Sequence, residues 1–162
     1  MKNFIYLSLL VIPFLSFSQV FFESGNVKYI NGDYSGAIID FSQALRDNPN
    51  YVQALSNRAA CKAKLKDYYG AITDLTKAID IDPNIALPYF NRARAKYDLK
   101  EYKEAIIDFT KAIEIDSNVA DFYLARGISK YMLGIFEDAC KDGLKARNLG
   151  ADASALIKIV CN

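Results

Sequence analysis

The chain has no histidine and no tryptophan among its 162 residues. Without histidine it can form no Ser-His-Asp or Cys-His catalytic pair, no histidine zinc site and no imidazole pH switch. It also lacks an excess of either charge, with 20 Lys and Arg against 19 Asp and Glu. A surface that binds DNA or RNA needs extra basic residues to displace counterions, so this balance argues against a nucleic-acid partner.

Motifs that hold cofactors are missing as well. The chain has no Cys-x-x-Cys pair, and no glycine-rich loop of the kind that cradles phosphate. We therefore expect no cofactor and no metal ion. The glycines that do occur at turns stand alone: Gly32, Gly70, Gly134 and Gly150.

The start of the chain has the layout of a targeting segment. Met1–Asn3 is a short positive start, Phe4–Leu15 is apolar, and Ser16 and Ser18 supply the small residues of a cleavage site. The apolar run is shorter than the roughly 20 residues that a transmembrane helix needs. We expect residues 1–18 to be a signal peptide, which makes the protein exported, periplasmic or extracellular, with no stable membrane anchor after cleavage. An uncleaved anchor or a buried first helix is the alternative.

The rest of the chain, residues 19–162, repeats with a period of 34 residues. Residues 69–84 and 103–118 share ten identities in sixteen positions. A small residue recurs at one position of each unit, an aromatic residue at another and an alanine at two more. These sets are Gly25, Ala59, Ala93 and Gly127; Tyr34, Tyr68, Tyr102 and Phe136; Ala37, Ala71, Ala105 and Ala139; and Ala44, Ala78, Ala112 and Ala146.

Each unit is expected to be a pair of helices. Large apolar and small residues recur at spacings of three and four, as on one face of an α-helix. Helix breakers fall twice per unit, for example at residues 31–33 and 48–50. The predicted fold class is all-α, with helix–turn–helix repeats at about 18–51, 52–85, 86–119 and 120–150, and a C-terminal capping helix at about 151–161.

This pattern resembles the tetratricopeptide repeat, whose large–small–aromatic–Ala–aromatic–Ala–Pro signature is met at most positions across residues 18–151. The resemblance implies a right-handed superhelical solenoid. Gly143 departs by replacing a large apolar residue, near the end of the array where atypical capping repeats are expected. Ser117 replaces a proline. Lysines stand where an aromatic is usual, and we expect them to be solvated with their stems on apolar surface: Lys28, Lys62, Lys96 and Lys130.

Two further charges recur with the repeat. An arginine stands at Arg58, Arg92 and Arg126, and an aspartate at Asp40, Asp74, Asp108 and Asp142. A basic stripe for phosphate or nucleic acid is one interpretation. The neutral charge balance favours a repeated Arg–Asp ion pair between stacked helices. Each arginine lies 16 residues before one aspartate and 18 after another, so the partner stays open.

The three cysteines differ in context. Cys61 lies beside two alanines on a predicted helix and is expected to be a buried thiol. In an exported protein, a Cys140–Cys161 disulfide would join the capping helix to the last repeat. Two free thiols are the alternative.

The resemblance also implies a function. In the tetratricopeptide family the first helix of each repeat lines a concave groove that receives a peptide segment or a partner helix. We therefore expect a non-catalytic protein-interaction scaffold or adaptor, with a protein or peptide partner. The groove positions carried over from the family are Asn26, Tyr29, Asn57, Lys64, Phe90, Asn91, Arg94, Tyr97, Leu124 and Tyr131.

One subfamily grips a partner's C-terminal carboxylate with two lysines, two asparagines and an arginine. Asn26 and Asn57 match the two asparagines of that clamp. The three basic positions are occupied by Phe22, Leu87 and Asn91, so we expect no such clamp.

Two other functions remain open. Carboxylates are plentiful, so the chain could be an enzyme or the accessory domain of an envelope enzyme. Against this, the acids recur with the repeat as solvated residues do, and none stands in an apolar setting that would raise its pKa. Self-association of a short array through its ends, giving a structural homo-oligomer, is the other alternative.

Overall fold

A computed structural model describes residues 16–161 of the chain, and within that range it contains helices and no strands. The prediction of an all-α fold built from helix–turn–helix repeats is confirmed. The helices are α1 (Phe17–Ile30), α2 (Tyr34–Asp47), α3 (Val52–Lys64), α4 (Tyr68–Ile81), α5 (Ala86–Asp98), α6 (Tyr102–Ile115), α7 (Ala120–Met132), α8 (Phe136–Asn148) and α9 (Ser154–Val160).

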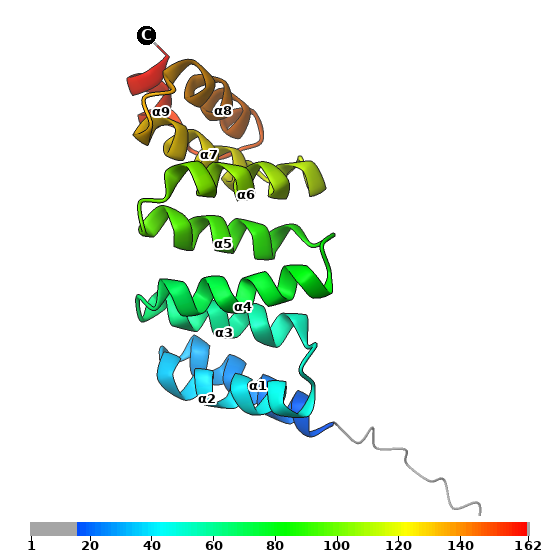
Figure 1. Ribbon diagram of the computed structural model, residues 1–162. Coiled ribbons are helices and arrows are strands. Elements are labelled where there is room, and N and C mark those ends of the chain that lie inside the picture. Colours follow the sequence, from blue (N-terminus) through cyan, green and yellow to red (C-terminus); the bar gives the residue numbers. More distant parts are fainter. Residues whose placement is uncertain (1–15, 162) are drawn as a thin grey trace, which may run out of the picture.

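The helices stack in chain order, with α1 and α9 at opposite ends of the array (Figure 1). Each odd-numbered helix up to α7 pairs with the even-numbered helix that follows it, and each pair packs on the next. Successive odd-numbered helices also touch one another, whereas no two successive even-numbered helices do so within residues 16–161. The odd-numbered helices therefore form the inner, concave side of the array. The handedness of the superhelix stays a prediction.

Local side-chain contacts fix where the helices begin. Asp33 and Asp67 each accept a hydrogen bond from a backbone N–H three residues on, at 2.9 Å, and so cap α2 and α4. The turn inside each pair needs one residue in the left-handed region. Glycine fills that position at Gly32 and Gly134, while Lys66 and Lys100 adopt it with φ of 64°.

Each of the first three repeats packs a small residue of its first helix against a large residue of its second. In the first repeat, a Cβ added to Gly25 would lie 2.7 Å from a ring carbon of Phe41. Ala59 clusters with Leu75 in the second repeat, and Ala93 with Phe109 in the third. Because the small residue admits the large one, the paired helices come close enough to exclude water.

The predicted Arg–Asp ion pair is confirmed, and the arginine's partner is the aspartate 16 residues later in the same repeat. Arg92 donates to both carboxylate oxygens of Asp108, at 2.8 and 2.7 Å. Its third nitrogen donates to Thr76 of the preceding repeat at 3.1 Å. Arg58 and Arg126 repeat this arrangement. Each arginine therefore joins its own aspartate to the repeat before it.

The prediction that the four recurring lysines are solvated is wrong. Lys96 lies one helical turn after Arg92, on the same face of α5, and its Nζ lies 2.7 Å from Asp108. Lys28, Lys62 and Lys130 reach the aspartates of their own repeats in the same way. A buried carboxylate is costly unless it is paired and hydrogen-bonded, and the lysine supplies a second partner. In the first repeat, Ser24 stands in place of the arginine and donates to Asp40 at 2.6 Å.

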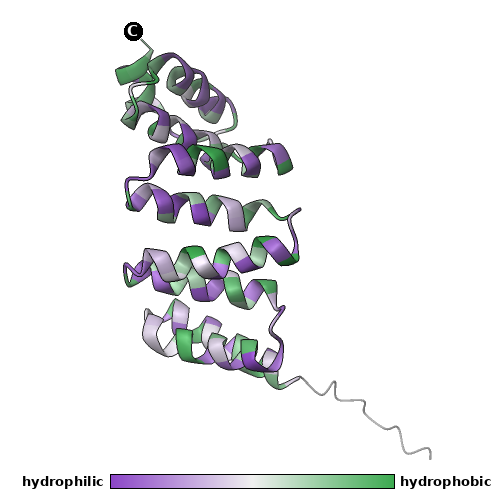
Figure 2. Ribbon diagram, in the orientation of Figure 1, coloured by the Kyte–Doolittle hydropathy of each residue, from purple (hydrophilic) through white to green (hydrophobic). Residues whose placement is uncertain are grey.

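The fourth repeat packs differently because Gly143 replaces the large residue of the other repeats. The space beside Gly143 is filled by α9, whose Leu156 and Ile157 side chains lie against it. Leu156 also lies against Gly127, where an added Cβ would be 3.0 Å from its Cδ2. Figure 2 shows α9 as largely hydrophobic, next to a largely hydrophilic α8. A leucine from the capping helix thus does the work of the missing core residue.

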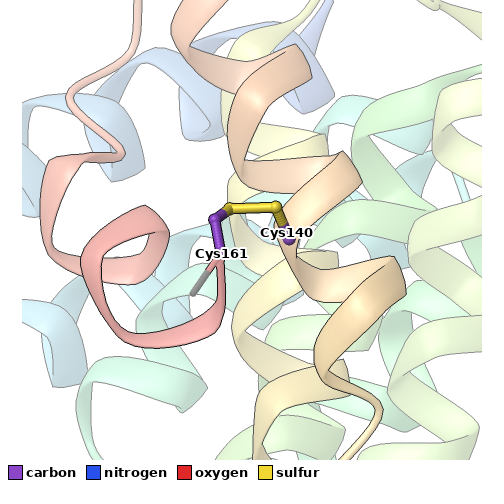
Figure 3. The surroundings of a disulfide bond; sticks show 2 residues. All are labelled: Cys140 and Cys161. Carbon is purple, nitrogen blue, oxygen red and sulfur yellow. A yellow bond between two sulfur atoms is a disulfide. The ribbon is translucent and has the colours of Figure 1, made fainter.

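A disulfide joins the end of α9 to α8, as predicted (Figure 3). The Cys140 and Cys161 sulfurs are 2.06 Å apart, and the two Cα atoms are separated by 5.1 Å. The bridge spans 21 residues of chain and holds α9 against Gly143. Cys61 is a buried free thiol, also as predicted.

Most of the expected signal peptide, residues 1–15, lies outside the described residues. Ser16 caps α1, and Phe17 and Ser18 belong to its first turn, so the expected cleavage point falls inside that helix. Among the helices of residues 16–161, none combines the length and the apolar character that crossing a membrane requires.

Candidate functional site

The concave side of the array holds two adjoining pockets that share Arg94 and Asp98 of α5. One, of about 370 Å³, lies between α5 and α7 and has mostly apolar walls; we call it the apolar pocket. The other, of about 460 Å³, lies between α3 and α5; we call it the cationic pocket. The apolar pocket is lined by Phe90, Arg94, Tyr97, Asp98, Phe109, Asp121, Leu124, Ala125 and Ile128. The cationic pocket is lined by Tyr29, Ala59, Ala60, Ala63, Lys64, Lys66, Tyr68, Ala71, Leu75, Asn91, Arg94, Ala95 and Asp98.

The cationic pocket exists because the second repeat lacks a ring that the others have. In repeats one, three and four a tyrosine of the first helix meets an aromatic residue of the second, with ring centroids 5.2 to 5.9 Å apart. The corresponding residue of the second repeat is Ala63, which leaves the ring of Tyr68 at the pocket wall. Leu75, smaller than the phenylalanine of repeats one and three, lies deeper in the same wall.

The apolar pocket has rigid walls. The ring of Phe90 packs against Phe109 at 5.6 Å and against Phe122 at 4.8 Å between centroids, which fixes its position on α5. Tyr97 packs on Tyr102 at 5.2 Å. Because these rings are held from behind, their free faces are ready to receive an apolar side chain without losing much freedom.

Arg94 stands between the two pockets. Its guanidinium carbon lies 5.8 Å from the centroid of the Phe90 ring, and its side chain is exposed. Within the part of the chain that the structure describes, neither Arg94 nor Lys64 nor Lys66 forms an ion pair. Arg92, two residues earlier, is the opposite case: its hydrogen bonds to Asp108 raise the pKa of its guanidinium further above the usual range. The cations of the groove are therefore available to a ligand.

Seven of the ten groove residues expected from the sequence line these pockets: Tyr29, Lys64, Phe90, Asn91, Arg94, Tyr97 and Leu124. Asn26 and Asn57 lie outside them and hydrogen-bond to each other at 2.8 Å. Tyr131 packs against the cluster of α8 and α9 that the disulfide holds together. These three side chains are therefore engaged within the protein.

Some pocket residues were missed from the sequence. Lys66, Asp98 and Asp121 line the pockets but were not among the expected groove residues. The signal for the cationic pocket was present in the repeat itself, since Tyr29, Ala63, Tyr97 and Tyr131 occupy one position. Comparing the repeats for lost bulk, rather than for matches, would have found it.

Two carboxylates, Asp98 and Asp121, lie at the apolar pocket, which raises the question of hydrolysis. A pair that cleaves a glycosidic bond needs one acid held protonated by an apolar, desolvated setting. Both side chains are exposed, so neither has that setting. No cluster of three or more potential metal-binding residues occurs within residues 16–161.

Comparison with known families agrees with the repeat pattern. The family described as tetratricopeptide repeat matches residues 52–85 and 86–119. The chain contains tetratricopeptide repeats. This is a family of scaffolds that are generally non-catalytic and act in protein–protein interaction. The helix pairs before and after the matched residues repeat the same arrangement.

Solved structures share the fold over most of the array. A MamA protein is 23% identical over 88% of this chain and 80% of its own, with a TM-score of 0.81. The first tetratricopeptide-repeat domain of Spaghetti, solved with a bound HSP90 peptide, is 23% identical over 73% of this chain and 94% of its own, with a TM-score of 0.71. The tetratricopeptide-repeat domain of Arabidopsis OM64 is 29% identical over 71% and 95%, with a TM-score of 0.70.

Proposed function

We propose that this protein is an exported, non-catalytic scaffold that binds an extended segment of a partner protein in its concave groove. The observation that carries the proposal is the pair of adjoining pockets, which together present exposed rings, an amide and three unpaired cations along α3, α5 and α7. An extended peptide has backbone groups to pair and alternate side chains to place in pockets. A groove with this mixture of surfaces suits such a ligand.

Relatives with the same fold support this role. The Spaghetti domain was solved with a peptide from HSP90, so an array of this shape can hold a peptide. The basic residues of the carboxylate clamp are absent here, and Asn26 and Asn57 bond to each other. The proposed contact surface is therefore the pair of pockets further along the array.

Export is supported by two features of the chain. Residues 1–18 have the layout of a signal peptide. The Cys140–Cys161 disulfide suits an oxidising compartment such as a bacterial periplasm or the extracellular space. Mass spectrometry of the protein recovered from cell fractions tests this: a first residue of Gln19 outside the cytoplasm is expected, and an intact Met1 in the cytoplasm would refute export.

Site-directed photo-crosslinking in the producing cell tests the groove. A photoreactive residue at Ala60, in the cationic pocket, should capture the partner, whereas one at Lys77, exposed on the outer helix α4, should not. Ala63→Tyr restores the ring that the other repeats carry and should abolish capture at Ala60. Capture at Lys77 alone, or capture unaffected by Ala63→Tyr, would refute the groove. Capture of a second copy of the chain would favour self-association instead.

A further inference from the structure

From the charges and walls of the two pockets, we infer which segment the groove takes. It carries an acidic side chain for the cationic pocket and, within a few residues of it, a large apolar side chain for the apolar pocket. The inference rests on the proposed function and adds the chemistry of the partner.

The cationic pocket is built to receive a carboxylate. Lys64, Lys66 and Arg94 contribute three positive charges to its lining, against the single negative charge of Asp98. Its floor is made of small residues, Ala59, Ala63 and Ala71, which leave room for a side chain to enter. Asn91 adds an amide that can donate to the same carboxylate. A carboxylate here meets donors that no other group of the described residues occupies.

The apolar pocket recognises a different group. Phe90, Tyr97, Leu124 and Ile128 give it walls of ring and methyl surface. Its volume of about 370 Å³ exceeds what one leucine or phenylalanine side chain fills, so a large apolar residue enters without forcing the walls apart. Burying such a side chain contributes roughly 1.5–3 kcal/mol before the costs of association.

Arg94 and Asp98 line both pockets, so the two anchoring residues must lie close together in the ligand. An extended chain advances about 3.3 Å per residue, and adjoining pockets are reached by residues one to three positions apart.

The acid is a side chain within the segment rather than the end of the partner. The cationic pocket reaches from Tyr29 on α1 to Arg94 on α5, and the groove continues beside it to α7. A carboxylate placed near Lys64, in the middle of this stretch, has groove on both sides. The ligand chain therefore passes through the pocket.

Selection from a library of random dodecapeptides tests the inference separately from the proposed function. Bound peptides are eluted from the disulfide-bonded protein and tested again on Ala63→Tyr. Peptides that fail to bind this variant define the groove ligands, and an acidic residue one to three positions from a large apolar residue is expected in them. Groove ligands without this pair would overturn the inference while the groove stands. If no peptide depends on Ala63, the proposed function itself fails.

A labelled peptide with one internal glutamate, a nearby leucine and an amidated C-terminus gives the quantitative test by fluorescence anisotropy. Replacing its glutamate by lysine, or its leucine by alanine, should weaken binding at least tenfold. Lys64→Glu/Lys66→Glu should weaken binding of the parent peptide by a similar factor and improve binding of the lysine peptide. Lys77→Glu/Lys103→Glu makes the same charge change on exposed outer positions and should leave both affinities unchanged.

Equal effects of the two charge-reversed variants would show long-range attraction only, and would overturn the assignment of the acid to this pocket. Stronger binding of a shorter peptide that ends in a free carboxylate at the glutamate position would show that the ligand ends in the pocket, and would overturn the internal-acid assignment.

Discussion

The second and the fourth repeats depart from the pattern that the first and third share, and each departure removes bulk. In the fourth repeat, Gly143 leaves a space that Leu156 of α9 fills and a disulfide holds closed. In the second repeat, Ala63 leaves a space that no side chain of the described residues fills, and it remains a pocket on the concave side. Missing bulk at the end of the array makes a seat for the cap, whereas missing bulk in its middle makes a candidate binding site.

This comparison shows how one repeated helix pair serves two purposes. The ion-paired aspartates are kept in every repeat, so the stacking of the helices does not depend on the departures. The large residue and the tyrosine are then free to vary.

Leu156→Ala tests the filled space and should have the largest effect. It removes the side chain that lies between Gly127 and Gly143, and neither glycine can fill the cavity. We expect the free energy of unfolding to fall by about 2–5 kcal/mol in urea denaturation. Ile159→Ala, at an exposed position of the same helix, is the control and should cost less than about 0.5 kcal/mol. Equal costs would show that α9 does not complete the core.

Breaking the disulfide tests how the cap is held. For a loop of this length, the chain-entropy estimate of the stabilisation is roughly 3 kcal/mol. Cys140→Ser/Cys161→Ser should lose that amount in the same denaturation experiment. Adding reductant to the parent protein should reproduce the loss, and adding it to the double variant should change nothing. If the reduced parent were as stable as the oxidised one, α9 would be held by packing alone.

Cys61 tests the packing beneath the second repeat through its pH dependence. Burial raises the pKa of this thiol to about 11, because the thiolate loses its solvation. The unfolded thiol titrates near about 8.5, so the unfolded state loses its proton first as pH rises. Stability is therefore full below that pH and falls as the pH rises toward 11, by on the order of 1–2 kcal/mol.

The control for this measurement is Cys61→Ala, because alanine is the residue at the same position of the third repeat. Subtracting its pH dependence of unfolding removes the contributions of tyrosines and lysines. A flat difference between pH 8 and pH 10.5 would mean that the thiol reaches solvent and that the second repeat is looser than described.

Ala63→Tyr tests the open space and should have the smallest effect on stability, within about 1 kcal/mol. The new ring meets Tyr68 as Tyr29 meets Tyr34, so the chain's own pattern shows that it fits. The thermal unfolding midpoint should change little, while binding in the groove is lost. A large destabilisation would mean that Ala63 is needed for packing, and the pocket would then be a consequence of the core.

The sequence predicted the repeats, the disulfide and the buried thiol because each has a local or periodic signal. It predicted the Arg–Asp pair but left the partner open, since spacings of 16 and 18 residues are equally plain in a sequence. The lysines were missed because an amphipathic side chain was assumed to reach solvent, although they recur with the same period as the aspartates. The pockets depend on where bulk is absent, and the contact between Asn26 and Asn57 depends on how two helices approach. Neither has a signature in one residue.

The most direct test of the account is a titration of the ¹⁵N-labelled protein with the glutamate–leucine peptide, followed by amide chemical shifts. The account predicts saturable changes at the groove positions Ala63, Lys64, Arg94 and Leu124 at low peptide concentration. It predicts none at Ile39 and Ile107, which are exposed on the outer helices. Changes confined to the outer helices or to α9 would contradict the claim that the space left by Ala63 is a binding site.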